Sequence, residues 1–98
     1  MPKISVVIPV YNNQETLERC LSAIKQSAYQ DYEIVVADSG SRDETVAIAG
    51  RFTNKIISLR ENKGRGYSRA QGANAAAGGI IVNVDSDILV NPDTLSLI

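Results

Sequence analysis

The sequence predicts an α/β fold of three layers, α/β/α, with a parallel β-sheet between the helices. Short runs of β-branched residues alternate with segments whose apolar residues recur at helical spacing, the pattern of β-α-β units. These runs are nearly continuous, which is typical of strands buried on both faces of a parallel sheet. No repeat or linker divides the 98 residues, so a single domain is expected over residues 1–98.

The composition restricts the possible functions. Ten Lys and Arg residues against eleven Asp and Glu give a net charge of −1, which offers no electrostatic basis for binding nucleic acid or an anionic membrane. Histidine is absent and Cys20 is the single cysteine, so Ser-His and Cys-His pairs and His-ligated metals are excluded within this chain. Any metal must have oxygen ligands, as Mg²⁺, Mn²⁺ and Ca²⁺ prefer. The apolar run 4–10 is too short for a membrane span, and we expect a cytoplasmic location.

The first strand is predicted at 4–10, ending near Pro9, which cannot donate a ladder hydrogen bond. A helix is expected from about 14 to 27. Asn12 and Glu15 have the spacing of a capping box at its start. Its predicted apolar face consists of Leu17, Cys20, Leu21 and Ile24.

The second strand is predicted at 33–38 and a third at 55–59. Between them, Ser41 and Glu44 have the Ser-x-x-Glu spacing that caps a helix start. The helix that follows is short and is expected to end by Thr53.

The second half of the chain continues the alternation. A helix at about 67–77 is rich in small residues, which would let it lie close to the sheet, and Gly78 or Gly79 would supply a left-handed cap. The fourth strand begins at Ile80 and runs into an Asp-x-Asp. The sequence at 91–93, Asn-Pro-Asp, predicts the start of a last helix.

Asp85 and Asp87 follow the fourth apolar strand. If this strand stays extended, residues two apart point the same way, so both carboxylates would face one cation. Mg²⁺ and Mn²⁺ are typically held by one or two carboxylates together with phosphate oxygens. The pair therefore predicts a metal–diphosphate site. The alternative is a solvated acidic turn.

Other polar residues are expected at the same end of the sheet, where ligands bind in open α/β folds. Asp38 ends the second strand and can accept a hydrogen bond from a uracil imide or a ribose hydroxyl, or can anchor its own turn. Tyr11 can stack on a base or cover the edge of the core. Lys63, Arg65 and Arg69 begin a helix whose amino end favours anions, or form a solvated basic loop.

The order of these motifs resembles the inverting family 2 glycosyltransferases of the GT-A fold. The match extends over the whole chain, and the motifs in order are specific where each alone is weak. There are departures: Asp38 is followed by Ser39 where the family often has a second Asp, and Ile88 stands where a further acid is common. The matching phrases lie at 5–12, 33–45, 62–64, 68–72, 85–87 and Pro92.

The resemblance implies a nucleotide-diphospho-sugar transferase-like half domain with strand order 3-2-1-4. It implies that the chain binds a nucleotide-diphosphate sugar, most commonly a UDP-sugar in this family, with Mn²⁺ or Mg²⁺. Asp87, with Asp85, would hold the metal that bridges the diphosphate, and Asp85 would also lie near the ribose. The implied nucleotide-binding residues are Pro9, Tyr11, Asp38, Arg69 and Asp85.

The resemblance also implies that a second half is missing. In the family the acceptor side and the general base follow the metal motif, but only 11 residues follow Asp87. We therefore expect a truncated donor-binding half that binds a nucleotide sugar and transfers nothing alone. Its fourth strand, 80–84, would be an exposed edge that favours a homo-oligomer.

Two alternatives remain. The chain is a non-catalytic nucleotide-binding or assembly module of the same fold, or it is a haloacid-dehalogenase-like phosphatase. Leu89 disfavours the phosphatase, because that motif normally has Thr or Val at this position.

Overall fold

A computed structural model describes residues 2–87 of the chain. All neighbouring strands are parallel, in the order β3-β2-β1-β4. This confirms the predicted fold class and strand order. The helix predicted from residue 91 lies outside the described residues. The elements in chain order are β1 (Ile4–Val10), α1 (Leu17–Lys25), β2 (Tyr32–Asp38), α2 (Thr45–Gly50), β3 (Ile56–Ser58), α3 (Arg65–Ala75) and β4 (Ile80–Asn83).

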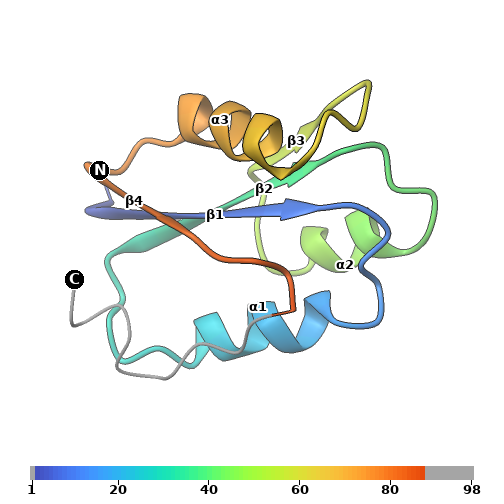
Figure 1. The fold of residues 1–98 in the computed structure, drawn as a ribbon. Helices are drawn as coiled ribbons and strands as arrows, with labels where there is room; N and C mark the ends of the chain where they lie inside the picture. The colour runs from blue at the N-terminus through green and yellow to red at the C-terminus, as the bar shows by residue number, and fades with distance from the viewer. Residues whose placement is uncertain (1, 88–98) are drawn as a thin grey trace.

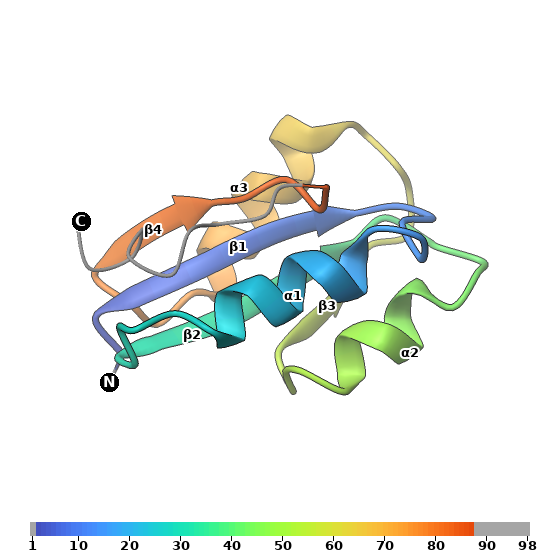
Figure 2. The same ribbon diagram turned by 90° about the horizontal axis from the view of Figure 1, so that it is seen from below.

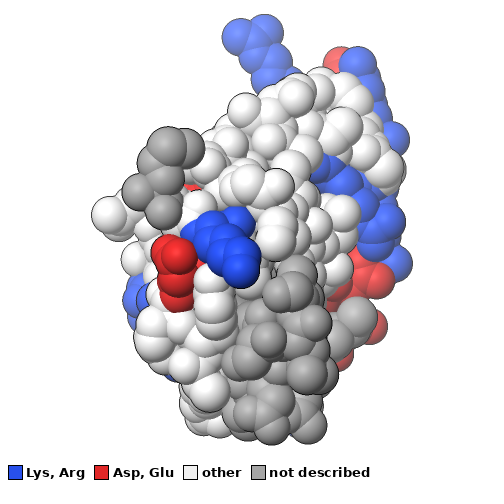
Figure 3. All heavy atoms as spheres, turned by 90° about the vertical axis from the view of Figure 1, so that its left-hand side faces the viewer, with Lys and Arg blue, Asp and Glu red and all other residues white. Residues whose placement is uncertain are grey.

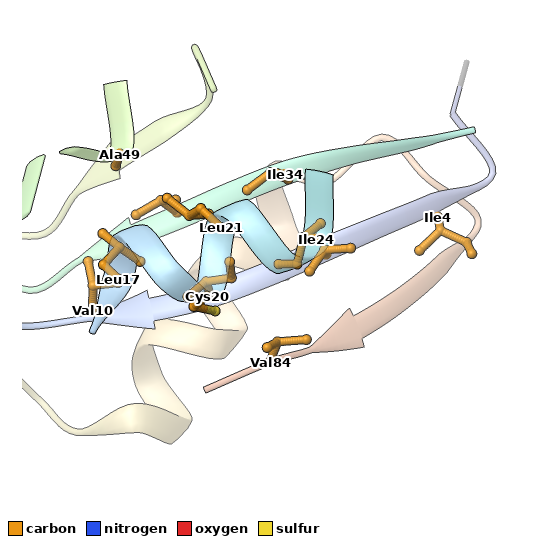
Figure 4. Close-up of a cluster of buried hydrophobic side chains, with 12 residues drawn as sticks. Ile4, Val10, Leu17, Cys20, Leu21, Ile24, Ile34, Ala49 and Val84 are labelled. Carbon is orange, nitrogen blue, oxygen red and sulfur yellow. The ribbon is translucent and has the colours of Figure 1, made fainter. Parts of the chain in front are cut away.

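The sheet lies between two helical layers: α3 covers one face, and α1 and α2 cover the other (Figures 1 and 2). Every residue of β1 is buried, which explains why its sequence is apolar without alternation. The predicted apolar face of α1 packs into the core beneath the sheet (Figure 4). No helix within residues 2–87 is long and apolar enough to span a membrane.

The small residues of α3 do bring it close to the sheet. A Cβ on Gly72 would lie 2.4 Å from Val7 Cγ1 on β1, so no larger residue fits there without a shift. The left-handed cap predicted at Gly78 or Gly79 is wrong. The helix ends at Ala75, and Ala76 is already extended. Gly78 is required for another reason, because its Cβ would lie 2.8 Å from the backbone of Ile4.

Both predicted capping boxes are also wrong. α1 begins at Leu17 and α2 at Thr45, and neither N-cap residue makes a side-chain capping hydrogen bond. Asn12 has a φ of 50°, outside any helix, and its side chain bonds another loop. The start of α2 is instead bonded by Asp43, whose Oδ1 accepts from the Thr45 N–H at 2.9 Å.

A polar cluster ties α3 and β4 to the amino ends of the strands. Glu33 Oε2 accepts from the Ser5 hydroxyl at 2.5 Å and from the Ala77 N–H at 2.6 Å, and Oε1 binds Lys55 Nζ at 2.9 Å. The Gly78 N–H donates to Ser5 Oγ at 2.8 Å. Burial alone would raise the pKa of Glu33, but these hydrogen bonds and the charge of Lys55 outweigh it and lower the pKa to about 2.

The face at which β1 begins carries both acidic and basic side chains among uncharged ones (Figure 3). Its visible charges do not gather into a patch of one sign. The candidate ligand-binding residues that the sequence predicted lie toward the opposite end of the sheet, where the strands finish.

Candidate functional site

A cleft forms at the carboxyl ends of the strands because β4 stops short of β1. β1 and β2 run in register to Val10 and Asp38, whereas the pairing of β1 with β4 ends at Val7 and Asn83. The last bond on that side runs from the Val84 N–H to Val7 O at 3.0 Å. In a parallel ladder the next donor would be residue 9. Pro9 has no N–H, so the chain after Val84 is free to leave the sheet.

The cleft has a volume of about 270 Å³. It contains the predicted Pro9 and Tyr11. Sequence reasoning missed several polar lining residues, although each follows a strand or begins a helix and so had a positional signal. A larger hollow of about 590 Å³ lies by α1 and α2, but no strand end contributes to it. The lining residues of the cleft are Pro9, Val10, Tyr11, Asn13, Ser39, Asn62, Gly64, Arg65, Ser68 and Ser86.

Two loops that frame the cleft hold each other by hydrogen bonds between side chains and backbone. The Asn12 N–H donates to Ser41 Oγ at 2.8 Å, and the Arg42 N–H donates to Asn12 Oδ1 at 2.9 Å. The Asn13 N–H donates to Thr45 Oγ1 at 2.8 Å. These reciprocal bonds fix the loops after β1 and β2 relative to each other. The residues that looked like helix caps therefore position the walls of the site.

The Asp38 side chain is buried, with 4% of the residue exposed. Oδ2 accepts from the Gly40 and Ser41 N–H groups at 3.2 and 3.1 Å, the turn-anchoring bond that the sequence left open. Oδ1 is buried and has no hydrogen-bond partner among the described residues. A buried carboxylate oxygen without a donor is costly, so this atom is suited to a ligand that donates a hydrogen bond.

Asp85 lies opposite α3 and is held by two arginines. Oδ1 binds Arg69 Nη2 at 2.7 Å, and Oδ2 lies 3.5 Å from Arg65 Nη1. Arg65 and Arg69 are one helical turn apart and so share a face of α3. Lys63 does not join them: its ammonium lies 5.2 Å from the centre of the Tyr67 ring and 3.8 Å from Glu61. The structure thus brings together two of the three predicted cations.

Asp85 and Asp87 were predicted to face one cation if the strand stayed extended to its end. This condition is not met, because β4 ends at Asn83. The chain then turns at Ser86 and Asp87. Asp87 is exposed.

Beneath the turn lies Cys20 of α1, whose thiol donates to the Asp85 carbonyl at 3.7 Å. Burial, followed by the charges of Asp87 and Asp85, raises the pKa of this thiol to about 11. Cys20 is therefore a packed core residue, as the sequence predicted, and its raised pKa disfavours the reactive thiolate.

The donor set suits a hard divalent ion only in part. Two carboxylates with oxygen donors fit Mn²⁺ or Mg²⁺, which take further oxygens from phosphate or water. In residues 2–87 no group of three or more acidic, Cys or His side chains is placed to hold a metal alone. A metal at Asp85 and Asp87 would therefore depend on ligands from a bound molecule.

A parallel sheet of this order, with acidic side chains at the carboxyl ends of its strands, is that of the GT-A fold, which the solved glycosyltransferase structures that it matches share. The model of the family described as glycosyl transferase family 2 matches residues 5–98. The chain belongs to this family.

Related proteins agree with the assignment. The chain is 35% identical over 94 residues to "Glycosyltransferase AglE" of Haloferax volcanii, covering 89% of this chain and 31% of that protein. It matches the crystal structure of S. aureus TarS 1-349 in complex with UDP-GlcNAc with a TM-score of 0.91 and 31% identity. That match covers 96% of this chain and 29% of TarS 1-349.

A further structural match is the mannosyltransferase PcManGT from Pyrobaculum calidifontis in complex with GDP-Man and Mn²⁺. The TM-score is 0.89 and the identity 28%, over 97% of this chain and 30% of PcManGT. The chain thus spans less than a third of the length of each of these three relatives.

Proposed function

We propose that residues 1–98 are the donor-binding portion of an inverting family 2 glycosyltransferase, and that they bind a nucleotide-diphosphate sugar through a divalent metal. The observation that carries the proposal is the cleft at the strand ends, which Ser39 and Ser86 line. Asp38, with its unpartnered Oδ1, directly precedes Ser39, and Asp85 directly precedes Ser86, although neither acid lines the cleft itself. Relatives of the same fold were solved with UDP-GlcNAc and with GDP-Man and Mn²⁺, which supports this class of ligand.

Each predicted residue has a role in this proposal. The Asp38 Oδ1 atom would accept a hydrogen bond from the base, for which the imide N–H of uracil is a suitable donor. We choose uracil over other bases with a ring N–H because UDP-sugars are the most common donors in this family. Pro9 and Tyr11 would contact the base in the cleft that they line. Arg69 would lie along the nucleotide, and its buried Nε has no hydrogen-bond partner among the described residues.

Asp87 and Asp85 would hold Mn²⁺ or Mg²⁺ against the diphosphate, and Asp85 would also lie near the ribose. The metal would act as a Lewis acid that neutralises the leaving nucleoside diphosphate. We assign no catalytic base within residues 2–87. The acceptor and its activation belong to the whole enzyme, so we propose that this chain alone binds the donor without transferring the sugar.

Calorimetric titration of UDP tests the proposal. We expect binding in Mn²⁺ that weakens when the metal is omitted, because the metal would link the Asp87 carboxylate to the negatively charged diphosphate. In Asp87→Asn the dependence on Mn²⁺ should disappear, while the metal-free affinity stays within about twofold.

The outcome also separates the alternatives. Absence of UDP binding at millimolar ligand, with or without Mn²⁺, would contradict a donor site and favour an assembly module that keeps the fold. If UDP binds and its affinity changes neither with Mn²⁺ nor in Asp87→Asn, the chain has a nucleotide site that does not use a metal at Asp87.

We also propose that β4 mediates self-association. Within the described residues β4 pairs with β1 on one side only, and Ile81 is 42% exposed. Apolar edge strands readily pair with another chain. We expect a concentration-dependent dimer by light scattering, shifted toward monomer in Ile81→Lys. A wild-type monomer at all concentrations would contradict this prediction.

A further inference from the structure

Arg65, a charged residue in the part of the cleft wall that α3 forms, has no role in the donor site proposed above. Arg65 is the first residue of α3 and lines the cleft, but its side chain is 69% exposed. Its only ion pair within residues 2–87 is the 3.5 Å contact with Asp85. No acidic residue occurs in the first turn of the helix. Asp85 thus has two cationic partners, a shorter contact with Arg69 and a longer one with the exposed guanidinium of Arg65.

The two contacts differ in how easily each is broken. The Arg69 contact is a 2.7 Å hydrogen bond to a largely buried carboxylate. The Arg65 contact is longer and exposed, and pairs of this kind contribute only about 0.2–1 kcal/mol. A competing ligand would therefore displace Arg65 from Asp85 before it displaced Arg69.

The charge balance indicates which ligand would compete. The two carboxylates proposed to hold the metal, Asp85 and Asp87, are balanced by the two positive charges of Arg65 and Arg69, whereas Asp38 belongs to the proposed base contact. In a nucleotide sugar each phosphate carries one negative charge, and a divalent ion balances the two. The part of the site proposed to receive the metal and the diphosphate is therefore neutral only if Arg65 is present. A guanidinium also matches phosphate oxygens by its fork of N–H donors.

We propose that Arg65 is a phosphate-binding residue that exchanges partners. In the free chain it pairs with Asp85 Oδ2. When a nucleoside diphosphate binds, Arg65 turns to the diphosphate and leaves Oδ2 available to the divalent ion. This inference rests on the donor site proposed above and adds a residue that selects diphosphates over monophosphates.

The experiment compares wild type with Arg65→Gln by calorimetry, using uridine, UMP, UDP and Mn²⁺ as separate ligands. In Arg65→Gln we expect uridine affinity to be unchanged and UDP affinity in Mn²⁺ to fall about 10-fold, as for loss of one charge-assisted hydrogen bond. UMP affinity should fall by less than threefold. Mn²⁺ alone should bind about threefold more tightly, because its competitor for Asp85 is gone.

Arg51→Gln is the matched control. Arg51 is 60% exposed and pairs with Glu18 at 2.9 Å, on the side of the sheet opposite α3 (Figure 1). Arg51→Gln removes one positive charge, as Arg65→Gln does, and it should leave the affinities for uridine, UMP, UDP and Mn²⁺ unchanged. The two variants should also melt within about 2 °C of wild type, since exposed ion pairs contribute little to stability.

Each other outcome contradicts a defined part of the inference. Equal loss of uridine and UDP affinity would make Arg65 a structural residue of the cleft. Unchanged UDP affinity would show that Arg65 does not bind the phosphates. Unchanged or weaker Mn²⁺ binding would show that Arg65 does not compete with the metal for Asp85. If wild type binds no UDP, the donor site itself fails and this inference fails with it. If wild type binds UDP, only the role of Arg65 is at stake.

Discussion

Replacing Glu33 by Gln should lower the free energy of unfolding by about 2 kcal/mol at pH 7 and remove much of the acid sensitivity of the fold. Glu33 has 18% side-chain exposure and accepts hydrogen bonds from Ser5 and Ala77 and a salt bridge from Lys55. A glutamine amide would place an N–H group where at least one of these donors lies. The connection from α3 to β4 would then be held less firmly, because its Ala77 N–H bonds Glu33, although the Gly78 N–H would still donate to Ser5.

The pH dependence follows from the direction of the shift. The pKa of Glu33 is lowered from 4.5 to about 2 in the folded chain. Its stabilising contribution is therefore complete above about pH 4.5 and is lost as the pH falls toward 2. Linkage sets an upper limit of about 3 kcal/mol, which partial exposure to solvent reduces.

Urea unfolding between pH 7 and pH 2, followed by circular dichroism, measures this effect. Wild type should lose more stability over that range than Glu33→Gln does. Glu18→Gln is the control, because Glu18 forms an exposed pair with Arg51 and should change stability by less than about 0.5 kcal/mol. Parallel pH profiles for wild type and Glu33→Gln would show that the polar cluster does not stabilise the fold.

The parts of the fold that the sequence predicts are those set by local patterns. The continuous apolar run of β1 predicted a central strand because a strand buried on both faces has no polar alternation. The small residues of α3 predicted its close approach to the sheet, and the structure has no space for a side chain at Gly72 beside Val7. Pro9 indicated a strand end. The β1–β4 ladder stops just before it, because Pro9 has no N–H to donate the next hydrogen bond.

The parts that the sequence does not predict depend on contacts between distant residues. Asn12 and Ser41 have the spacing of helix caps, but each bonds the other's loop, 29 residues away in the chain. Local spacing cannot distinguish these outcomes, since the same polar atoms satisfy either backbone. Likewise Asp85 was predicted to face a metal, whereas in the folded chain it faces Arg69, which only the packing of α3 places beside it.

The site predictions divide in the same way. The family resemblance implied Pro9 and Tyr11 as nucleotide-binding residues, and both line the cleft. Arg65 was predicted only as one of three cations that begin a helix or form a solvated basic loop. Its contact with Asp85 arises because β4 returns beside β1 in parallel, which brings residue 85 opposite the start of α3.

Asp38→Asn should reduce UDP affinity about 100-fold while leaving the fold intact. The asparagine carbonyl oxygen can keep accepting from the Gly40 and Ser41 N–H groups, as Asp38 Oδ2 does now. Its amide nitrogen then replaces Oδ1, the buried oxygen that has no hydrogen-bond partner within residues 2–87. A donor would meet the imide N–H of uracil where an acceptor is needed, and such a mismatch in a buried site is costly.

The same change removes a buried charge, so stability should stay within about 1 kcal/mol of wild type or increase. Cytosine presents an acceptor at the ring nitrogen where uracil has its N–H, so CDP should lose less affinity than UDP. Calorimetry with both nucleotides and a thermal melt measure these opposing effects. Asp31→Asn, an exposed acid next to β2, controls for net charge.

A stable Asp38→Asn variant that binds UDP as wild type does would remove Asp38 from the base contact and leave it as an anchor of its turn. A loss of UDP binding together with a large fall in melting temperature would mean that the carboxylate is needed for the loop rather than for the ligand. Only weakened UDP binding with retained stability, and a preference moved toward CDP, identifies Oδ1 as the acceptor that reads the base.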